Sequence, residues 1–250
     1  MHKYKWLWAA CFVVANQALA ADFGLSAGYW DYRVAGSVER DGISQDFQSD
    51  LDVKANRHDL YAFTWSTGPG WWRPDLAASY TPIKVSGQRT VQASGANLIN
   101  LLGIGSSSTT LVKGDADLAD IDLTARYPAQ LGTATVWGGI TIKHLSGTVV
   151  TRNSSDVAEN NQSINQTFPM LHLSGKVPLT SWLAITVQGN VIKYQDDSAN
   201  DFCVAVSLGF LGPIGLDLGW QRKSFKISQP DFKLDTTLSG LLLGASIALH

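Results

Sequence analysis

The chain has 250 residues, of which 16% are charged and 45% hydrophobic, and its formal net charge is −2. An ordinary soluble protein has about 25% charged residues, so this chain carries less charge than a soluble surface of its size normally does. Acidic and basic side chains are nearly balanced, which argues against a nucleic-acid partner, because phosphate backbones require a basic surface.

The first 20 residues have the features of a secretory signal peptide. A basic start precedes an apolar stretch over 6–15, and Ala18-Leu19-Ala20 provides a small-x-small cleavage site. We therefore predict a signal peptide over 1–20 and a single domain over 21–250. The apolar stretch is too short to cross a membrane as a helix. After cleavage Cys203 is the one remaining cysteine, so no intrachain disulfide is expected.

The rest of the chain alternates apolar and polar residues in strand-sized segments. In 182–194 the apolar face is Leu183, Ile185, Val187, Gly189 and Val191, and the other face is Trp182, Ala184, Thr186, Gln188 and Asn190. Successive strand residues point to opposite faces, so this segment has one apolar wall and one polar wall. Membrane β-barrels use strands of about 9–11 residues with this pattern, in even numbers.

Ten such segments predict an all-β fold, a single antiparallel up-and-down transmembrane β-barrel. The predicted strands are 23–36, 57–66, 75–86, 115–127, 133–147, 166–177, 181–194, 201–210, 215–226 and 237–249. Short proline-containing turns at 67–74, 128–132, 178–180 and 211–214 alternate with polar connections at 37–56, 87–114, 148–165, 195–200 and 227–236. Outer-membrane barrels show this asymmetry, with tight periplasmic turns and longer external loops.

Aromatic residues collect near the predicted strand ends, where a barrel meets the two lipid–water interfaces. On the periplasmic side they are Trp71, Trp72, Tyr127, Trp182 and Phe210, and on the outer side they are Trp30, Tyr194 and Phe202.

Polar residues at inward positions form a predicted lumen network, which is either structural or a selectivity lining. Its members are Asp120, Asp122, Arg126, Lys143, His172, Lys176, Asp217, Gln221 and Lys223. Inward charges in a narrow barrel usually pair with one another and fill the space. A turn near residue 130 is expected to bring Asp120 and Asp122 close to Lys143, with His172 beside Lys143 on the next strand.

No metal-ligand spacing, phosphate loop or Gly-x-Ser-x-Gly motif is present, so we expect no metal and no cofactor. One alternative function is an outer-membrane hydrolase of the omptin type, with His58-Asp59 opposite Asp196-Asp197 at the outer rim. Such a site needs His as a base and a carboxylate to orient it. Residues adjacent in a strand diverge, however, and Asp is common in turns, so we predict no enzyme.

Several short segments, in order along the mature chain, resemble a family of small Gram-negative outer-membrane β-barrel proteins of unassigned function. They are Gly24-Leu25-Ser26-Ala27-Gly28-Tyr29-Trp30, Ser49-Asp50-Leu51-Asp52, Phe168-Pro169-Met170-Leu171-His172-Leu173-Ser174-Gly175-Lys176-Val177-Pro178-Leu179, Gly215-Leu216-Asp217-Leu218-Gly219-Trp220-Gln221-Arg222 and Gly240-Leu241-Leu242-Leu243-Gly244. The resemblance implies a barrel in the outer membrane without an agreed activity. The chain ends in Ala248-Leu249-His250, whereas such proteins usually end in an aromatic residue that the assembly machinery reads.

These observations predict an integral outer-membrane barrel with a structural or surface-interaction role or a narrow solute passage. Expected partners are outer-membrane lipid and lipopolysaccharide, with the barrel-assembly machinery and periplasmic chaperones during biogenesis, and we expect a monomer. A second alternative to this function is a secreted soluble barrel that binds an apolar ligand. It would place the apolar wall inside, and alternation alone does not say which wall faces out.

Overall fold

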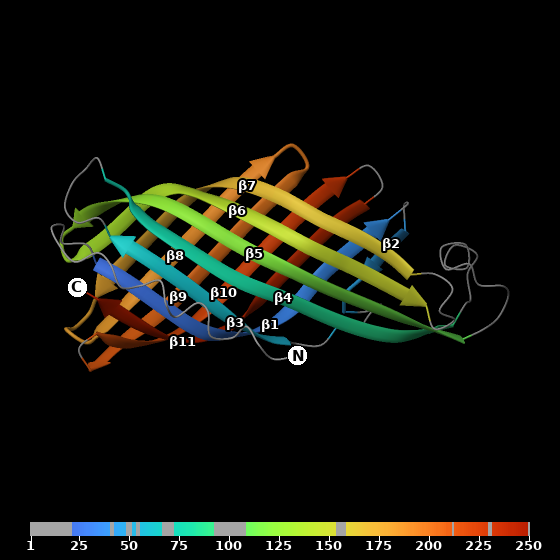
Figure 1. Cartoon of the computed structure of the whole chain (residues 1–250), viewed down its shortest axis with the longest axis horizontal. Coiled ribbons are helices and arrows are strands. Elements are labelled where there is room, and N and C mark those ends of the chain that lie inside the picture. Colours follow the sequence, from blue (N-terminus) through green and yellow to red (C-terminus); the bar gives the residue numbers. More distant parts are fainter. Residues whose placement is uncertain are drawn as a thin grey trace, which may run out of the picture.

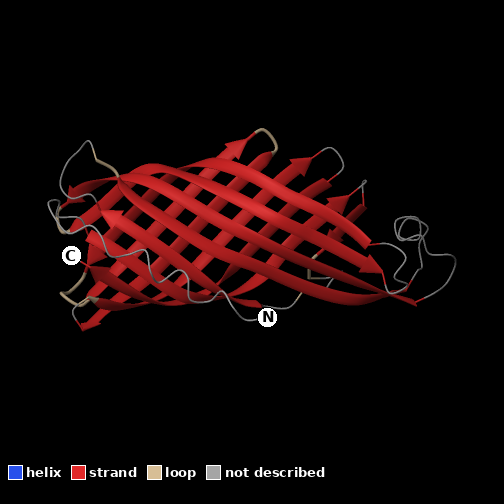
Figure 2. Cartoon of the chain, viewed as in Figure 1, coloured by secondary structure: helices blue, strands red, loops and turns tan. Residues whose placement is uncertain are grey.

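The computed structural model describes residues 22–40, 43–48, 52–53, 56–66, 73–92, 109–153, 159–211, 213–229 and 232–249. Strands make up nearly all of this part of the chain, and Figure 2 shows no helix in it. Within these ranges no helix is long and apolar enough to cross a membrane. The strands are β1 (Asp22–Arg40), β2 (Ile43–Asp46), β3 (Asn56–Ser66), β4 (Asp75–Gln92), β5 (Thr109–Leu131), β6 (Ala134–Asn153), β7 (Glu159–Pro178), β8 (Leu183–Tyr194), β9 (Asp197–Leu211), β10 (Ile214–Gln229) and β11 (Phe232–Leu249).

Ten of these strands form a closed antiparallel barrel. Each pairs with its neighbours in the chain, from β1 and β3 through to β11, and β11 pairs back with β1 from Phe23↔Leu249 to Arg40↔Phe232. The short β2 folds back on the end of β1 and lies outside the ring of ten. Figure 1 shows the strands crossing the long axis of the barrel at an angle, as closure requires. The predicted ten-stranded up-and-down barrel is confirmed.

The connections at the end where β1 begins are short, as predicted, but one of them is shifted. The predicted turn 128–132 is wrong, because β5 continues through Pro128 and pairs with β6 as far as Leu131↔Ala134. The turn is Gly132-Thr133, and Gly132 has a φ of +63°, a left-handed conformation that glycine adopts without steric cost. This end is periplasmic by the rule that short turns face the periplasm.

At the opposite end, much of what was predicted as loop is strand. β4 and β5 continue to Gln92 and from Thr109, and β6 and β7 continue to Asn153 and from Glu159. The predicted connection 195–200 shrinks to the turn Gln195-Asp196, 227–236 shrinks to the two residues between β10 and β11, and 37–56 contains β2. β5 is 23 residues long, roughly twice what a membrane crossing needs. The barrel therefore extends beyond the membrane on its outer side.

This extension has the reverse polarity of the membrane-spanning part, as β11 shows. Near the periplasmic end its outward residues are the exposed Leu241, Leu243, Ala245, Ile247 and Leu249, while Gly244 and Ser246 point inward. Nearer the outer end the outward residues are Lys233, Asp235, Thr237 and Ser239, and the inward ones are the buried Phe232, Leu234 and Leu238. The apolar outward run is nine residues long, which matches one tilted membrane crossing.

Candidate functional site

Five charged side chains meet inside the barrel at its waist, and we call them the waist cluster: Asp120, Asp122, Lys143, Asp201 and Lys223. Lys143 Nζ lies 2.7 Å from Asp120 Oδ1, 2.6 Å from Asp122 Oδ1 and 3.0 Å from Asp201 Oδ2. Lys223 Nζ forms an ion pair with Asp120 Oδ2 and lies 3.6 Å from Asp122 Oδ2. All five are buried, so the ammonium groups are neutralised mainly by these carboxylates rather than by water.

The waist cluster joins opposite walls of the barrel. Asp120 is on β5 and Lys223 is on β10, which are five positions apart in a ring of ten strands and therefore face each other across the lumen. Their direct ion pair means that side chains meet in the middle of the bore. A ten-stranded barrel is only slightly wider than the eight-stranded kind that side chains fill, so such contact is geometrically reasonable.

A layer of polar residues continues from the waist cluster toward the periplasm. Asn190 Nδ2 donates to Asp201 Oδ2 at 3.4 Å, and Asn190 Oδ1 accepts from Thr141 at 3.1 Å. His172 Nδ1 lies 2.7 Å from the same Asn190 oxygen, and its Nε2 lies 2.9 Å from Ser174 Oγ. Asn190 therefore links the buried imidazole to the charged cluster.

The structure brings four of the nine residues of the predicted network into the waist cluster. Asp120, Asp122, Lys143 and Lys223 form the waist cluster, and Asp122 is directly opposite Lys143 in the register. The predicted contact between His172 and Lys143 is wrong, because Lys143 pairs with Phe168 and His172 pairs with Gly139, four residues away. The cause is the register between β6 and β7, which strand periodicity does not determine.

The remaining predicted residues lie closer to the periplasmic end. Arg126 stacks over the Trp137 ring at 4.9 Å, and its terminal nitrogen donates to Ser174 Oγ at 3.4 Å. Trp137 in turn donates to Asp75 Oδ2 at 3.0 Å. Lys176 and Asp217 line an open vestibule of about 500 Å³ at the periplasmic mouth. Gln221 is half-buried on β10 opposite Cys203.

Two carboxylates of the site are absent from the predicted network. Asp201 contributes a carboxylate to the waist cluster and Asp75 accepts the Trp137 indole hydrogen. Both stand at the first residue of a predicted strand, where a carboxylate looks like part of a turn. The inward position of Asp201, two residues before Cys203 on the same face, was the signal that could have identified it.

On the outer side of the waist cluster, the lumen is filled with apolar side chains, which we call the outer core. Trp30, Tyr32, Leu145, Phe225 and Ile227 are almost completely buried in it. Further members come from nearly every strand and include Val34, Ile83, Leu118, Ile164, Phe168, Met170, Phe232, Leu234, Leu238 and Leu242. This part of the barrel is packed like the interior of a soluble protein rather than like a water-filled channel.

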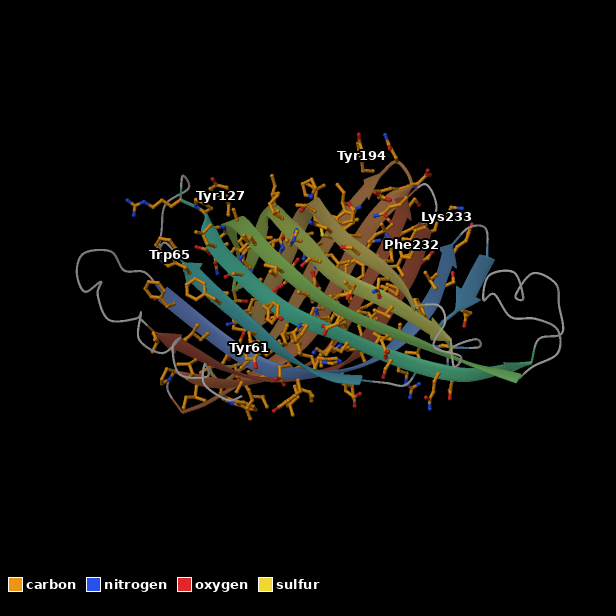
Figure 3. The ribbon with its side chains drawn as sticks, turned by 45° about the vertical axis from the view of Figure 1, so that its right-hand side comes forward. Tyr61, Trp65, Tyr127, Tyr194, Phe232 and Lys233 are labelled. Carbon is orange, nitrogen blue, oxygen red and sulfur yellow. The ribbon has the colours of Figure 1, made fainter. Side chains whose placement is uncertain are left out.

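The predicted interface aromatics divide into three groups. Tyr127, Trp182, Tyr194 and Phe202 are exposed on the outer surface of the barrel, and Figure 3 shows Tyr127 and Tyr194 near opposite ends. Trp30 is wrong as an interface residue: it is buried in the outer core, with its ring 4.6 Å from that of Tyr32. The side chains of Trp71, Trp72 and Phe210 lie outside the described residues.

The proposed hydrolase residues do not form a catalytic arrangement. His58 Nε2 lies 2.8 Å from the backbone oxygen of Lys84, whereas Asp59 is exposed and accepts from the Tyr61 hydroxyl at 3.2 Å. Asp197 accepts from the Ser228 amide at 2.7 Å. No interaction among the described residues joins His58-Asp59 to Asp196-Asp197. Within the described part of the chain, no three His, Cys, Asp or Glu side chains lie close enough together to hold a metal ion.

A closed antiparallel barrel with an apolar outward belt is a structure that can cross a bilayer, because its backbone groups pair between neighbouring strands around a closed ring. The outward residues in this belt include Leu25, Tyr80, Leu123, Leu171 and Leu218, all exposed. Burying such a surface in lipid is favourable by about 25 cal/mol per Å². The protein thus has the architecture of an integral membrane β-barrel.

Comparison with known proteins finds solved structures of similar fold at low sequence identity. The attachment invasion locus protein Ail of Yersinia pestis is 11% identical, with 92% of this chain and 99% of that chain covered and a TM-score of 0.36. An outer-membrane channel from Pseudomonas putida F1 is 12% identical, with coverages of 93% and 97% and a TM-score of 0.39. Neisserial surface protein A is 10% identical, with coverages of 90% and 96% and a TM-score of 0.38. No family model and no curated protein matches the chain.

Proposed function

We propose that this protein is a non-conducting, non-enzymatic outer-membrane barrel that presents a rigid β-sheet extension at the cell surface. The observation that carries the proposal is the pair of barriers inside the lumen. At the waist, Asp120 and Lys223 meet from opposite walls, and above them the outer core fills the bore. A solute entering the periplasmic vestibule would meet both barriers in succession.

The outer extension supports the surface role. Its inward residues are apolar and its outward residues are polar, which is the pattern of a stable water-exposed barrel. Exposed ion pairs on it include Lys84–Asp117 at 3.2 Å and Lys233–Glu39 at 3.1 Å. The outer end of the barrel, where Tyr194 and Lys233 lie in Figure 3, is the surface that this proposal assigns to contacts outside the cell. Lipopolysaccharide is the first expected neighbour, with the barrel acting as a monomer assembled by the usual machinery and chaperones.

Electrical recording in a planar bilayer tests the closed lumen. The folded protein is expected to give no steady single-channel conductance, while a wide porin in the same bilayer serves as the positive control. A stable conductance for the folded protein would replace the proposal with the narrow solute passage that the sequence also allows.

Labelling of intact cells tests the surface role. A membrane-impermeant maleimide should modify Asp196→Cys in the β8–β9 turn and should not modify Thr133→Cys in the β5–β6 turn. Both positions are exposed turn residues at opposite ends of the barrel, so they are matched controls for each other. Modification of Thr133→Cys alone would reverse the topology.

A further inference from the structure

The outer surface of the barrel carries an apolar groove of about 710 Å³ on the wall formed by β11, β1, β3 and β4. The small residues Ala27, Ala78 and Ala245 line it. Larger side chains that line it as well are Leu25, Tyr61, Phe63, Tyr80, Ile121, Ile214 and Ile247. The groove is part of the lipid-facing belt, and Figure 3 shows Tyr61 on this outer surface.

Directly above this groove, the wall of the barrel comes apart. β3 and β4 pair from Trp65↔Leu76 to Tyr61↔Tyr80, and among the described residues their pairing ends there, although β3 begins at Asn56 and β4 continues to Gln92. The facing edges of the two strands above Tyr61 and Tyr80 form what we call the seam. The other edge of each strand is fully paired, β3 with β1 and β4 with β5.

Side chains partly replace the missing backbone pairing at the seam. His58 Nε2 lies 2.8 Å from the backbone oxygen of Lys84 and 3.3 Å from its nitrogen, and the Tyr32 hydroxyl donates to the same oxygen at 3.2 Å. An unpaired strand edge is not tolerated in hydrocarbon. The outward residues at this level are the exposed Asp59 and Lys84, so the seam lies at the polar boundary of the membrane.

An apolar groove that ends at a row of backbone hydrogen-bonding groups is complementary to an amphiphile. The groove fits its apolar chain, and the hydrogen-bonding groups fit its polar head. The seam lies toward the outer end of the barrel, so the polar end of any ligand would face the outer leaflet. We propose that the groove binds an acyl chain of an outer-leaflet lipid and that the seam receives the polar head group of that lipid. The continuity of the groove with the lipid-facing belt makes a lipid its occupant, rather than a second barrel.

Retention of lipid A by protein extracted from outer membranes in mild detergent tests this proposal. The variant with Ala27→Phe and Ala78→Phe fills the groove, and Ala125→Phe is the matched control, because Ala125 is exposed to lipid on β5 outside the groove. The groove-filled variant is expected to retain about tenfold less lipid A per barrel than the wild type, equivalent to about 1.4 kcal/mol. Ala125→Phe should retain the wild-type amount, and phosphatidylethanolamine should be unchanged in all three.

Equal lipid A in the wild type, the groove-filled variant and the control would mean general annular lipid only and would overturn the proposal. A parallel loss of phosphatidylethanolamine would overturn the assignment to the outer leaflet. If the groove-filled variant does not show the gel-mobility shift of a folded barrel, photo-cross-linking decides the matter. Benzoylphenylalanine in place of Phe63 should cross-link lipid A after detergent washing, whereas benzoylphenylalanine in place of Leu173 should not. Equal cross-linking at the two positions would contradict the site.

Discussion

The membrane-spanning part of the barrel and its outer extension are built from the same ten strands with opposite polarity. In the membrane part, Leu241 and Leu243 face outward, and the interior holds the waist cluster. In the extension, Leu234 and Leu238 of the same strand face inward, and Lys233 and Asp235 face outward. The outside of the barrel faces lipid in the first region and water in the second. The apolar side chains therefore point outward in the first region and inward in the second. One backbone architecture is thus stabilised by lipid outside in one region and by a hydrophobic core inside in the other.

The largest expected effect comes from removing one charge of the waist cluster. Lys143→Met leaves Asp120, Asp122 and Asp201 with Lys223 as the remaining ammonium group of the cluster. Leaving buried carboxylates without their partner should lower the free energy of unfolding by roughly 3–5 kcal/mol. Urea denaturation of the refolded barrel in detergent measures this, with Lys233→Met as the control, since Lys233 belongs to an exposed ion pair worth about 0–1 kcal/mol. Equal effects at the two positions would remove the distinction between interior and surface charge.

A second comparison tests whether the outer core stabilises the protein as a soluble core does. Leu145→Ala should lower the free energy of unfolding by about 2–5 kcal/mol, because it opens a cavity among packed side chains. Leu171→Ala changes an exposed residue of the lipid-facing belt, where lipid chains can take up the lost volume. We expect a smaller effect there, and the same denaturation experiment checks it. A larger effect for Leu171→Ala would show that the extension contributes little to stability.

The boundary between the two regions can be located with an outward charge on one strand. Leu171 and Thr167 are both exposed outward residues of β7, four residues and therefore two strand periods apart on the same face. Leu171→Arg should destabilise the barrel by about 2–4 kcal/mol if it lies near the bilayer midplane. Thr167→Arg should have almost no effect, since Thr167 belongs to the polar outer surface. Refolding into lipid vesicles followed by urea titration distinguishes them, and similar losses would place the boundary further out.

The smallest expected effect is the coupling within the waist cluster. Asp122→Ala alone should destabilise the protein, and adding Lys143→Met should cost less than the two single changes together. The coupling energy expected for residues in contact is about 0.5–3 kcal/mol. Thermal unfolding of the four proteins in the cycle measures it, and strict additivity would contradict the 2.6 Å contact between the two groups.

Sequence alternation was sufficient for the strands inside the membrane but failed in the extension. Residues 148–165 read as a polar loop because the segment is rich in Ser, Thr and Asn. In the structure Thr148, Ser163 and Asn165 lie on the exposed face, whereas Ile164 is buried on the other face, as are Leu145 and Phe168 just outside the segment. In the described parts of β6 and β7 the apolar alternation continues, with its phase reversed and its polar face rich in Ser and Asn. The prediction that Trp30 lies at the membrane interface was wrong for the same reason. Trp30 stands where β1 passes from the membrane-spanning part of the barrel into the outer extension, and there the apolar side chains point inward.

The sequence by itself determined the number of strands in the barrel ring and which residues share a face, because the period of two is a local property of an extended backbone. It also put Asp120, Asp122, Lys143 and Lys223 inside before any pairing was known. Only the closed barrel decided that Lys223 reaches Asp120 across the lumen and that Lys143 reaches Asp201. Those contacts depend on the register of every strand pair and on the closure between β11 and β1, which no single strand encodes.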